Sequence, residues 1–276
     1  MIQVIMLAVR RMWTLVFLLV LLLVLAGAML PFFFMVVTSL QDTDNVSLNF
    51  STTRMNLSNF VSLFTSYDFG SAILTSAIVV VLACTMNLVV TSLAAFAFEK
   101  KPFRGSEALF TVYIVSMMIP AQVTIIPMFT IMRNLDLLNT HLSLALPIVN
   151  AFGVFLIRQF LSTIPDELLE AARLDGASDL RIFRTIVLPL IRPVLVALTI
   201  FTFISTWNDF LWPLVSITDS QMQTVTLAAA NMVGNLTQEY GLIMAGSLVS
   251  FLAPFVIYII LQRQFVAGVT ASGLKG

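Results

Sequence analysis

The sequence has few charged residues, a single cysteine and a single histidine. Charged residues make up 10% of the 276, whereas 59% are hydrophobic and the mean hydropathy is +1.00. So little polar surface cannot cover the apolar core of a soluble domain. The lone Cys84 excludes an internal disulfide and a thiolate metal site, and no catalytic constellation can be assembled around His141. We therefore expect an integral membrane protein with no catalytic residue and no metal site of its own.

The chain also lacks an internal repeat, a linker rich in Pro, Gly or Ser, and a second hydrophilic domain. Its formal net charge is zero and its pI is about 6.6, which leaves no basic surface for a nucleic acid. No polar segment is long enough to fold as an ATPase. The sequence predicts a single transmembrane domain over residues 1–276, in contact with membrane lipid and not with nucleic acid.

Six hydrophobic segments are candidates to cross a bilayer, because about 20 apolar residues in a helix span the hydrocarbon layer. The fourth is short, and the fifth contains Arg192 flanked by Pro189 and Pro193. The sequence predicts an all-α membrane protein with six transmembrane helices, over residues 12–40, 71–98, 108–132, 142–160, 187–206 and 241–261.

The distribution of Lys and Arg predicts the orientation of these helices. Six spans put both termini on one side, and twelve of the 14 basic residues fall on that side, whereas only Arg54 and Arg133 fall on the other. An excess of Lys and Arg marks the cytoplasmic side. We expect both termini, and the polar stretch between the fourth and fifth spans, to face the cytoplasm. The twelve residues are Arg10, Arg11, Lys100, Lys101, Arg104, Arg158, Arg173, Arg181, Arg184, Arg192, Arg263 and Lys275.

That polar stretch, residues 165–189, is called the charged loop below. Pro165 suits a first helical turn, and Asp166 and Glu167 oppose the positive end of a helix. Gly176 can supply a left-handed stop, and Ser178 can cap a second helical segment. The pattern predicts a short amphipathic helix, a glycine turn and a second helix. A polar loop lying at the lipid headgroups is the alternative on physical grounds alone.

The charged loop also has the spacing of a known motif. Glu170, Ala171 and Ala172 are followed after three residues by Gly176, and nine residues later by Ile186-Val187-Leu188-Pro189. This pattern resembles the EAA loop of binding-protein-dependent ABC importer permeases. The resemblance implies a type I ABC importer permease fold, whose coupling helix between spans four and five docks on a cytoplasmic ATPase. It assigns ATPase coupling to Glu170, Ala171, Ala172, Asp175 and Gly176.

The C-terminal residues 262–276 resemble the tail of one subgroup, the carbohydrate permeases similar to the second membrane subunit of the maltose and glycerol-3-phosphate transporters. Gly273, Lys275 and Gly276 match that ending, although Ser272 and Leu274 differ from the small residues usual there. In the maltose-type family this tail reaches between the two ATPase subunits. The resemblance therefore implies a second ATPase contact through Gly273, Lys275 and Gly276, and a frayed chain end is the alternative.

Two further stretches resemble carbohydrate-permease signatures. One contains Pro120 and Gln122 in the third span, where prolines free backbone groups that protein or a water-filled cavity must satisfy. The other contains Trp207, Asn208 and Asp209 at the end of the fifth span. These five residues are candidates for the translocation path or gate. A proline-kinked packing helix and a hydrated interfacial carboxylate are the structural alternatives.

The resemblance implies a noncatalytic permease subunit of an ATP-driven sugar importer in the inner or plasma membrane of a bacterium. Its implied partners are a second homologous permease, two copies of an ABC ATPase and an extracytoplasmic solute-binding protein. This chain would bind no cofactor, and ATP and Mg would be held by the ATPase.

Three other classes of membrane protein are alternatives to this interpretation. An ion-coupled secondary transporter is the main alternative, but it normally shows acidic residues near the bilayer midplane or repeated halves, and neither occurs here. A channel would need a ring of polar residues in its pore or a filter loop, and neither is evident in the sequence. A membrane enzyme would need a catalytic constellation, and none can be assembled around His141.

Overall fold

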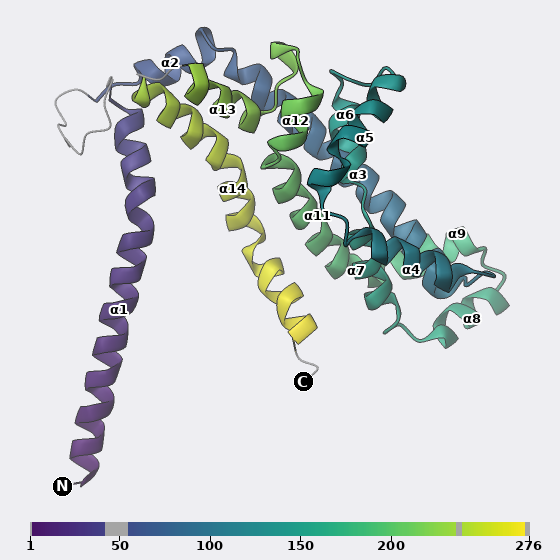
Figure 1. The fold of residues 1–276 in the computed structure, drawn as a ribbon. Coiled ribbons are helices and arrows are strands. Elements are labelled where there is room, and N and C mark those ends of the chain that lie inside the picture. The colour runs from purple at the N-terminus through teal and green to yellow at the C-terminus, as the bar shows by residue number, and fades with distance from the viewer. Residues whose placement is uncertain (1, 42–54, 236–238, 274–276) are drawn as a thin grey trace. The chain divides into compact units, whose positions relative to one another are not determined.

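The structure is a computed structural model, and it describes residues 2–41, 55–235 and 239–273. The described residues form helices joined by short turns, with one isolated bridge between Gln41 and Met55 and no β-strand. Three short segments differ from the α-helix: the 3-10 turns Leu146–Ile148 and Ser220–Met222, and the π segment Phe183–Val187. In chain order (Figure 1) the helices are α1 (Ile2–Ser39), α2 (Ser58–Thr65), α3 (Phe69–Lys100), α4 (Ser106–Ser116), α5 (Ala121–Asn134), α6 (His141–Ala145), α7 (Ala151–Leu161), α8 (Asp166–Leu174), α9 (Asp179–Ile182), α10 (Leu188–Leu190), α11 (Arg192–Trp207), α12 (Leu211–Ser216), α13 (Val225–Asn235) and α14 (Tyr240–Gly273).

The chain divides into two compact units, one made of residues 1–67 and 231–251 and the other of residues 68–230 and 252–276. In the first unit, the side chain of Asn59 at the start of α2 closes the end of α1. Its amide nitrogen donates to the carbonyl oxygens of Ser39 (3.0 Å) and Gln41 (2.9 Å). Carbonyls at a helix end have no partner within the helix, so Asn59 supplies one. A single transmembrane domain over the whole chain remains a prediction.

The predicted spans are of two kinds in the structure. Three helices are each long and apolar enough to cross a membrane: residues 10–39 of α1, all of α3, and residues 240–261 of α14. The side chains of residues 10–33 of α1 are all exposed, for example 60% for Leu19, as expected of a helix whose solvent is lipid. The three remaining predicted spans are helix pairs bent at a break, so the described residues hold between three and six spans.

The third predicted span differs most from a continuous helix. It consists of α4 and α5, which meet at an angle of 105°. Pro120 directly precedes α5 with φ −59° and ψ 135°, and a proline disfavours helical geometry in the residue before it. Pro127, by contrast, lies inside α5 without ending it. The fourth and fifth spans are bent by 44° between residues 148 and 151 and by 76° at Ile191.

In the second unit, α3 packs against α6, α7 and α11. Gly153 lets α7 lie close to both α3 and α11, because a Cβ at this position would lie 2.8 Å from Cγ2 of Thr91 on α3 and 3.2 Å from Cδ2 of Leu198 on α11. Asn87 of α3 donates to the hydroxyl of Thr202 on α11 at 2.9 Å. These contacts join three helices around one buried centre.

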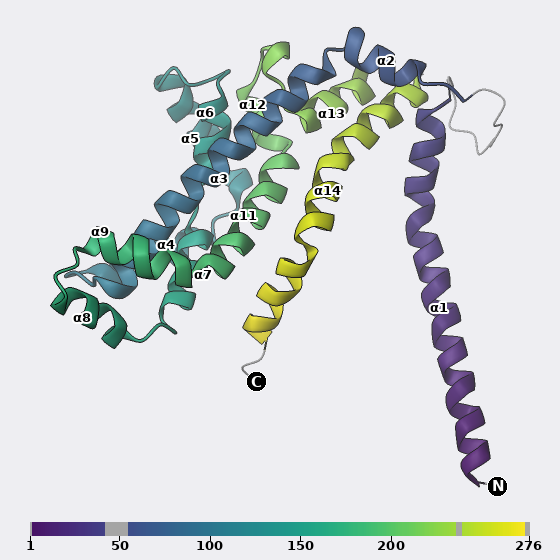
Figure 2. The same ribbon diagram turned by 180° about the vertical axis from the view of Figure 1, so that it is seen from behind.

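A second buried group, called the α3-end cluster, surrounds the C-terminal end of α3. It joins α3, α7, α8, α9 and α11, and the two views in Figures 1 and 2 show α8 and α9 at this end of the second unit, opposite α6 and α12. The cluster consists of Ala95, Phe96, Phe98, Val154, Ile157, Leu161, Ile164, Leu169, Ile182, Phe183, Val187, Ile191, Val194 and Leu198.

Candidate functional site

The charged loop contains a short helix with one buried and one exposed face. Leu169 of α8 is 1% exposed within the α3-end cluster, and Ala172, one turn later, packs against the same cluster. Glu170 and Ala171 are exposed, and Leu174 is 90% exposed. The helical period of 3.6 residues produces this division. The exposed face of α8 therefore combines the carboxylate of Glu170, the small side chain of Ala171 and the exposed side chain of Leu174.

The start of α8 agrees with the sequence. Asp166 and Glu167 lie in its first turn, as predicted, where carboxylates stabilise the positive end of the helix. Pro165 occupies the position just before the helix, with φ −59° and ψ 138°, rather than the first turn itself. Proline has no N–H to donate, so either position is compatible with the ring.

The end of α8 is a Schellman turn, and the predicted left-handed conformation of Gly176 is confirmed by its φ of 82°. The Gly176 amide donates to the carbonyl of Arg173, and the Ala177 amide donates to the carbonyl of Ala172, both at 3.0 Å. Ala172 and Ala177 also pack against the α3-end cluster, which places an apolar residue at each of the two positions where this turn usually has one. Asp175, between the helix and the turn, is exposed.

Replacing Gly176 with alanine should loosen this turn. No other atom lies within 4 Å of the position of an added Cβ, so the cost comes from the left-handed backbone alone, about 1–2 kcal/mol. Hydrogen exchange of the Gly176 and Ala177 amides should then speed up by about 5–30-fold. Gly176→Asn should recover part of the loss because asparagine tolerates this conformation.

Gly105 provides the matched control, since its φ of 89° is also left-handed and its surroundings are also open. Gly105→Ala should cost a similar amount but leave the exchange of the Gly176 and Ala177 amides unchanged. Equal exchange rates in Gly176→Ala and in the parent protein would contradict the role given to the glycine.

The chain after Gly176 continues as predicted toward the fifth span. Ser178 holds the position before α9 in an extended conformation, but its side chain makes no capping hydrogen bond in the structure. The following π segment, Phe183–Val187, and α10 lead to the 76° bend at Ile191. Pro189 lies inside α10.

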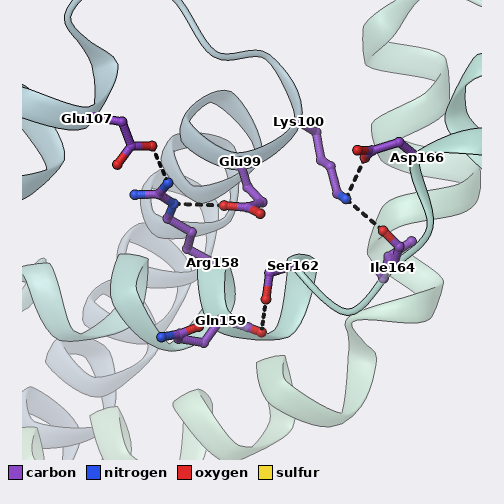
Figure 3. Close-up of polar contacts among 8 residues, drawn as sticks. All are labelled: Glu99, Lys100, Glu107, Arg158, Gln159, Ser162, Ile164 and Asp166. Carbon is purple, nitrogen blue, oxygen red and sulfur yellow. Dashed lines mark hydrogen bonds and ion pairs between the residues drawn. The ribbon is translucent and has the colours of Figure 1, made fainter.

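A polar network connects the charged loop to the end of α3. The ammonium of Lys100 lies 2.7 Å from the Ile164 carbonyl oxygen and 2.7 Å from a carboxylate oxygen of Asp166, as Figure 3 shows. Lys101 pairs with Asp179 of α9 at 2.6 Å. Two consecutive lysines therefore reach both helices of the charged loop.

The neighbouring Glu99 belongs to a second part of the network, centred on Arg158 of α7 (Figure 3). Nε of Arg158 donates to Glu99 at 2.8 Å, and Nη2 donates to Glu107 of α4 at 2.5 Å. The guanidinium carbon also lies 4.0 Å from the centre of the Phe110 ring. One arginine thus ties α3, α4 and α7 together at the end of the unit that carries α8.

The candidate gate residues fall at two separate places in the chain. Pro120 and Gln122 lie at the bend between α4 and α5, where Gln122 is exposed. Trp207 ends α11, is 5% exposed and stacks on Phe203 with 5.7 Å between ring centroids. A buried indole offers no open face to a sugar in this conformation. The role of these residues in a path remains a prediction.

Asn208 and Asp209 follow directly after α11. The side-chain amide of Asn208 donates to the carbonyl of Ile204 at 2.9 Å. A carboxylate oxygen of Asp209 accepts a hydrogen bond from the backbone N–H of Trp212 at 3.4 Å. Burial raises the pKa of Asp209 above its ordinary value, against the opposing effect of the backbone N–H groups of residues 210–212. The carboxylate is therefore partly occupied in holding the start of α12.

The predicted tail contact lies mostly outside the described residues. Gly273 is the last residue of α14, and Lys275 and Gly276 follow beyond it. Among the residues that the structure describes, no group of three or more His, Cys, Asp or Glu side chains is arranged to hold a metal ion.

Comparison with known proteins decides the family. Residues 87–270 match the sequence model of a protein family, the binding-protein-dependent transport system inner membrane component. These residues include α8, the Gly176 turn and the whole network around Lys100 and Arg158. The chain belongs to this family of transport permeases. The predicted resemblance to ABC importer permeases is thereby confirmed.

Curated permeases of this family include relatives with similar sequences over most of their length. The arabinooligosaccharides transport system permease protein AraQ of Halalkalibacterium halodurans is 34% identical over 239 residues, covering 84% of each chain. The lactose transport system permease protein LacG of Rhizobium radiobacter is 31% identical over 246 residues, covering 88% of this chain and 89% of that one. The sn-glycerol-3-phosphate transport system permease protein UgpE of Salmonella typhi is 41% identical over 189 residues, covering 67% of each.

The fold of this permease also matches a solved structure. A chain from the crystal structure of a bacterial ABC transporter involved in the import of the acidic polysaccharide alginate aligns with a TM-score of 0.80, at 22% identity, over 92% of this chain and 96% of that one. At this identity the likeness establishes the fold. The predicted all-helical permease fold is therefore confirmed, whereas the six spans, the side of the termini and the position of the coupling helix stay predictions.

The sequence of the permease did not reveal which residues hold α8 in place. Lys100 and Arg158 contributed only to the charge distribution that orients the spans, and no local pattern singled out Glu99 or Leu174. The partners Lys100 and Asp166 are 66 residues apart, and no local pattern links them. The one available signal was the position of Lys100 and Lys101 at the end of a span, facing a loop rich in aspartate.

Proposed function

We propose that this permease is the noncatalytic membrane subunit of an ATP-driven sugar importer, and that α8 is its docking helix for a cytoplasmic ABC ATPase. The family of the chain supports transport that depends on a binding protein. Two ATPase subunits, a second homologous permease and an extracytoplasmic solute-binding protein complete the proposed assembly. ATP and Mg are bound by the ATPase, and this chain needs no cofactor.

The observation that carries the docking proposal is the exposed face of α8. Leu174 is 90% exposed although it is a large apolar residue at the end of a well-anchored helix. Glu170 on the same face can accept charge-assisted hydrogen bonds, and Ala171 permits close approach of a partner surface. Buried Leu169 and the Gly176 turn hold this face in one orientation. In this proposal Glu170, Ala171, Asp175 and Gly176 contact or shape the interface, and Ala172 supports it from below.

The class of substrate follows from the relatives. Permeases named for arabinooligosaccharides, lactose and glycerol 3-phosphate are 31–41% identical to this chain, which supports a sugar, an oligosaccharide or a related polyol phosphate as the cargo. The path would run between this permease and its homologous partner, with Pro120, Gln122, Trp207, Asn208 and Asp209 as candidates for its lining or gate.

The proposed topology has six spans, with each bent helix pair counted as one span. The twelve basic residues on the side of the termini support a cytoplasmic location for both termini and for α8. The tail, with Gly273, Lys275 and Gly276, would then lie on the same side as the ATPase and provide its second contact. The proposed location is the inner or plasma membrane of a bacterium.

Replacing Glu170 with lysine should detach the ATPase from the permease. The exposed acid would become a cation at the centre of the interface, and like or unpaired charges at an interface cost several kcal/mol. The measurement is co-purification of the ATPase with the tagged permease complex from detergent, together with uptake of radiolabelled lactose, arabinotriose and glycerol 3-phosphate into vesicles loaded with ATP. We expect at least a tenfold loss of bound ATPase, which corresponds to about 1.4 kcal/mol, and a parallel loss of uptake.

Glu239→Lys is the matched control, because Glu239 is an exposed acid between α13 and α14. This variant should retain both the ATPase and uptake. Full retention of the ATPase in Glu170→Lys would reject α8 as the docking helix, and uptake that follows an ion gradient without ATP would reject an ATP-driven importer.

A further inference from the structure

Lys100 occupies an unusual position for a lysine in this permease. Its side chain is 4% exposed, although it ends a long helix beside a loop rich in charge. A buried ammonium is stable only where charges and hydrogen-bond acceptors replace water. Its two acceptors, at 2.7 Å each, are the carbonyl of Ile164, just before the charged loop, and the carboxylate of Asp166 in the first turn of α8 (Figure 3). The contact therefore specifies where the start of α8 sits on α3.

The remaining contacts between α3 and the charged loop are of a different kind. Phe96 of α3 packs against Phe183 with 5.4 Å between ring centroids, and apolar packing of this type has no fixed direction. The pair of Lys101 and Asp179 is about half exposed, with 37% and 54% of the side chains accessible, and exposed ion pairs contribute little. Among the described residues, Lys100 is the one buried cation that joins α3 to the start of α8. It donates to the Ile164 carbonyl and to the carboxylate of Asp166, whose own side chain is 72% exposed.

The covalent connections of α8 are less direct than this contact. On one side, four residues in a turn, 162–165, separate α8 from α7. On the other side, the path to α11 passes through the Gly176 turn, the π segment Phe183–Val187 and the 76° bend at Ile191. Each of these breaks interrupts a rigid helical connection. A displacement of α8 reaches α3 through Lys100 without crossing any of them.

At the same end, α3 is also attached to the neighbouring helices. Glu99 directly precedes Lys100 and binds Arg158 of α7, which in turn binds Glu107 of α4. Farther along, α3 packs against α11 and α6. A force applied at Lys100 is therefore delivered to a helix that contacts most of the second unit.

We propose that Lys100 is a positioning residue that clamps α8 to α3, so that α3 is the span that receives the movement of the docked helix. The proposal rests on the proposed function of α8. It adds that the permease transmits this movement across a noncovalent contact formed by Lys100, Asp166 and the Ile164 carbonyl, and that α8 and α3 move as one body.

The test measures the distance between α8 and α3 during the ATP cycle. Spin labels are placed at Leu168 of α8 and Val90 of α3, each 45% exposed, in a Cys84→Ser background that removes the natural cysteine. The complete complex is measured by double electron–electron resonance without nucleotide and with ATP and vanadate. In the parent complex the distance distribution should be the same in both states, because the two helices move together.

In Lys100→Met the clamp is removed while the apolar stem is kept. The distance distribution should broaden, and on addition of ATP and vanadate it should shift by about 1–2 Å, the size of helix displacements in switching proteins. Lys100→Arg should restore the parent behaviour, since a guanidinium can donate to both oxygens. Lys101→Met, which removes only the exposed pair, should behave like the parent.

Asp166→Asn is the second test variant, because it keeps the bond from Lys100 to the Ile164 carbonyl and should produce a smaller shift in the same direction. Distributions in Lys100→Met and Asp166→Asn that match the parent in both states would overturn the clamp. This failure is distinct from that of the docking proposal, which is decided by whether the ATPase still co-purifies with Glu170→Lys.

Discussion

Replacing Arg158 with methionine should destabilise the permease by about 3 kcal/mol, the lower end of the cost of breaking a buried ion pair. The guanidinium is 16% exposed and its partner Glu99 is 21% exposed, so the substitution leaves a carboxylate that water reaches poorly and that has lost its cation. Loss of the contact with the Phe110 ring adds to this cost. The measurement is the thermal midpoint of the detergent-purified complex, followed by gel filtration.

Two further variants separate the charge effect from a loss of packing. Glu107→Gln removes only a 74% exposed partner of Arg158 and should cost less than about 1 kcal/mol. The double variant Arg158→Met with Glu99→Gln should recover much of the stability, because the one carboxylate left without its cation, Glu107, is 74% exposed to solvent. If Arg158→Met is no less stable than Glu107→Gln, the network does not hold α3, α4 and α7 together.

Replacing Gly153 with alanine should cost about 2 kcal/mol, in the range found for overpacking a closely packed core. The added Cβ would lie 2.8 Å from Cγ2 of Thr91 and 3.2 Å from Cδ2 of Leu198. Because these neighbours belong to α3 and α11, the three helices must move apart to admit one methyl group. The change should appear as a lower thermal midpoint of the complex and a smaller yield of folded protein.

The same crowding predicts a rescue. Thr91→Ser removes the nearest methyl group but keeps the hydroxyl, which donates to the Asn87 carbonyl at 2.5 Å, so the Gly153→Ala and Thr91→Ser double variant should regain part of the lost stability. Gly27→Ala is the control, since no other atom lies within 4 Å of its added Cβ and alanine favours a helix. An equal effect of alanine at Gly27 and Gly153 would contradict close packing at Gly153.

Local features of the charged loop were predictable because they depend on neighbours in the chain. The acids of the first turn, the helical period and the left-handed Gly176 each follow from backbone geometry within one or two turns. The same reasoning placed the ends of α3 within two residues, at 71–98 against Phe69–Lys100. It was less accurate for the third span, where two prolines in one apolar run gave no indication that the helix would break before Pro120 but continue through Pro127, and that the bend would reach 105°.

The three-dimensional arrangement of the candidate site was harder to predict from the sequence. The exposed and buried faces of α8 could not be assigned from the sequence, because Leu168, Leu169, Ala171, Ala172 and Leu174 offer more than one apolar face. Contact with the α3-end cluster selects Leu169 and Ala172 for the interior and leaves Leu174 outside.

The sequence by itself determined the membrane class of the protein, its helical content, the motif from Glu170 to Pro189 and the family that this motif indicates. Composition and local spacing are sufficient for these properties, since the hydrophobic effect and backbone geometry act over short stretches of chain. The tertiary structure decided that Lys100 meets Asp166, that Arg158 meets Glu99 and Glu107, and that Gly153 lies among three helices. These contacts join residues far apart in the chain, and packing of the helices alone brings them together.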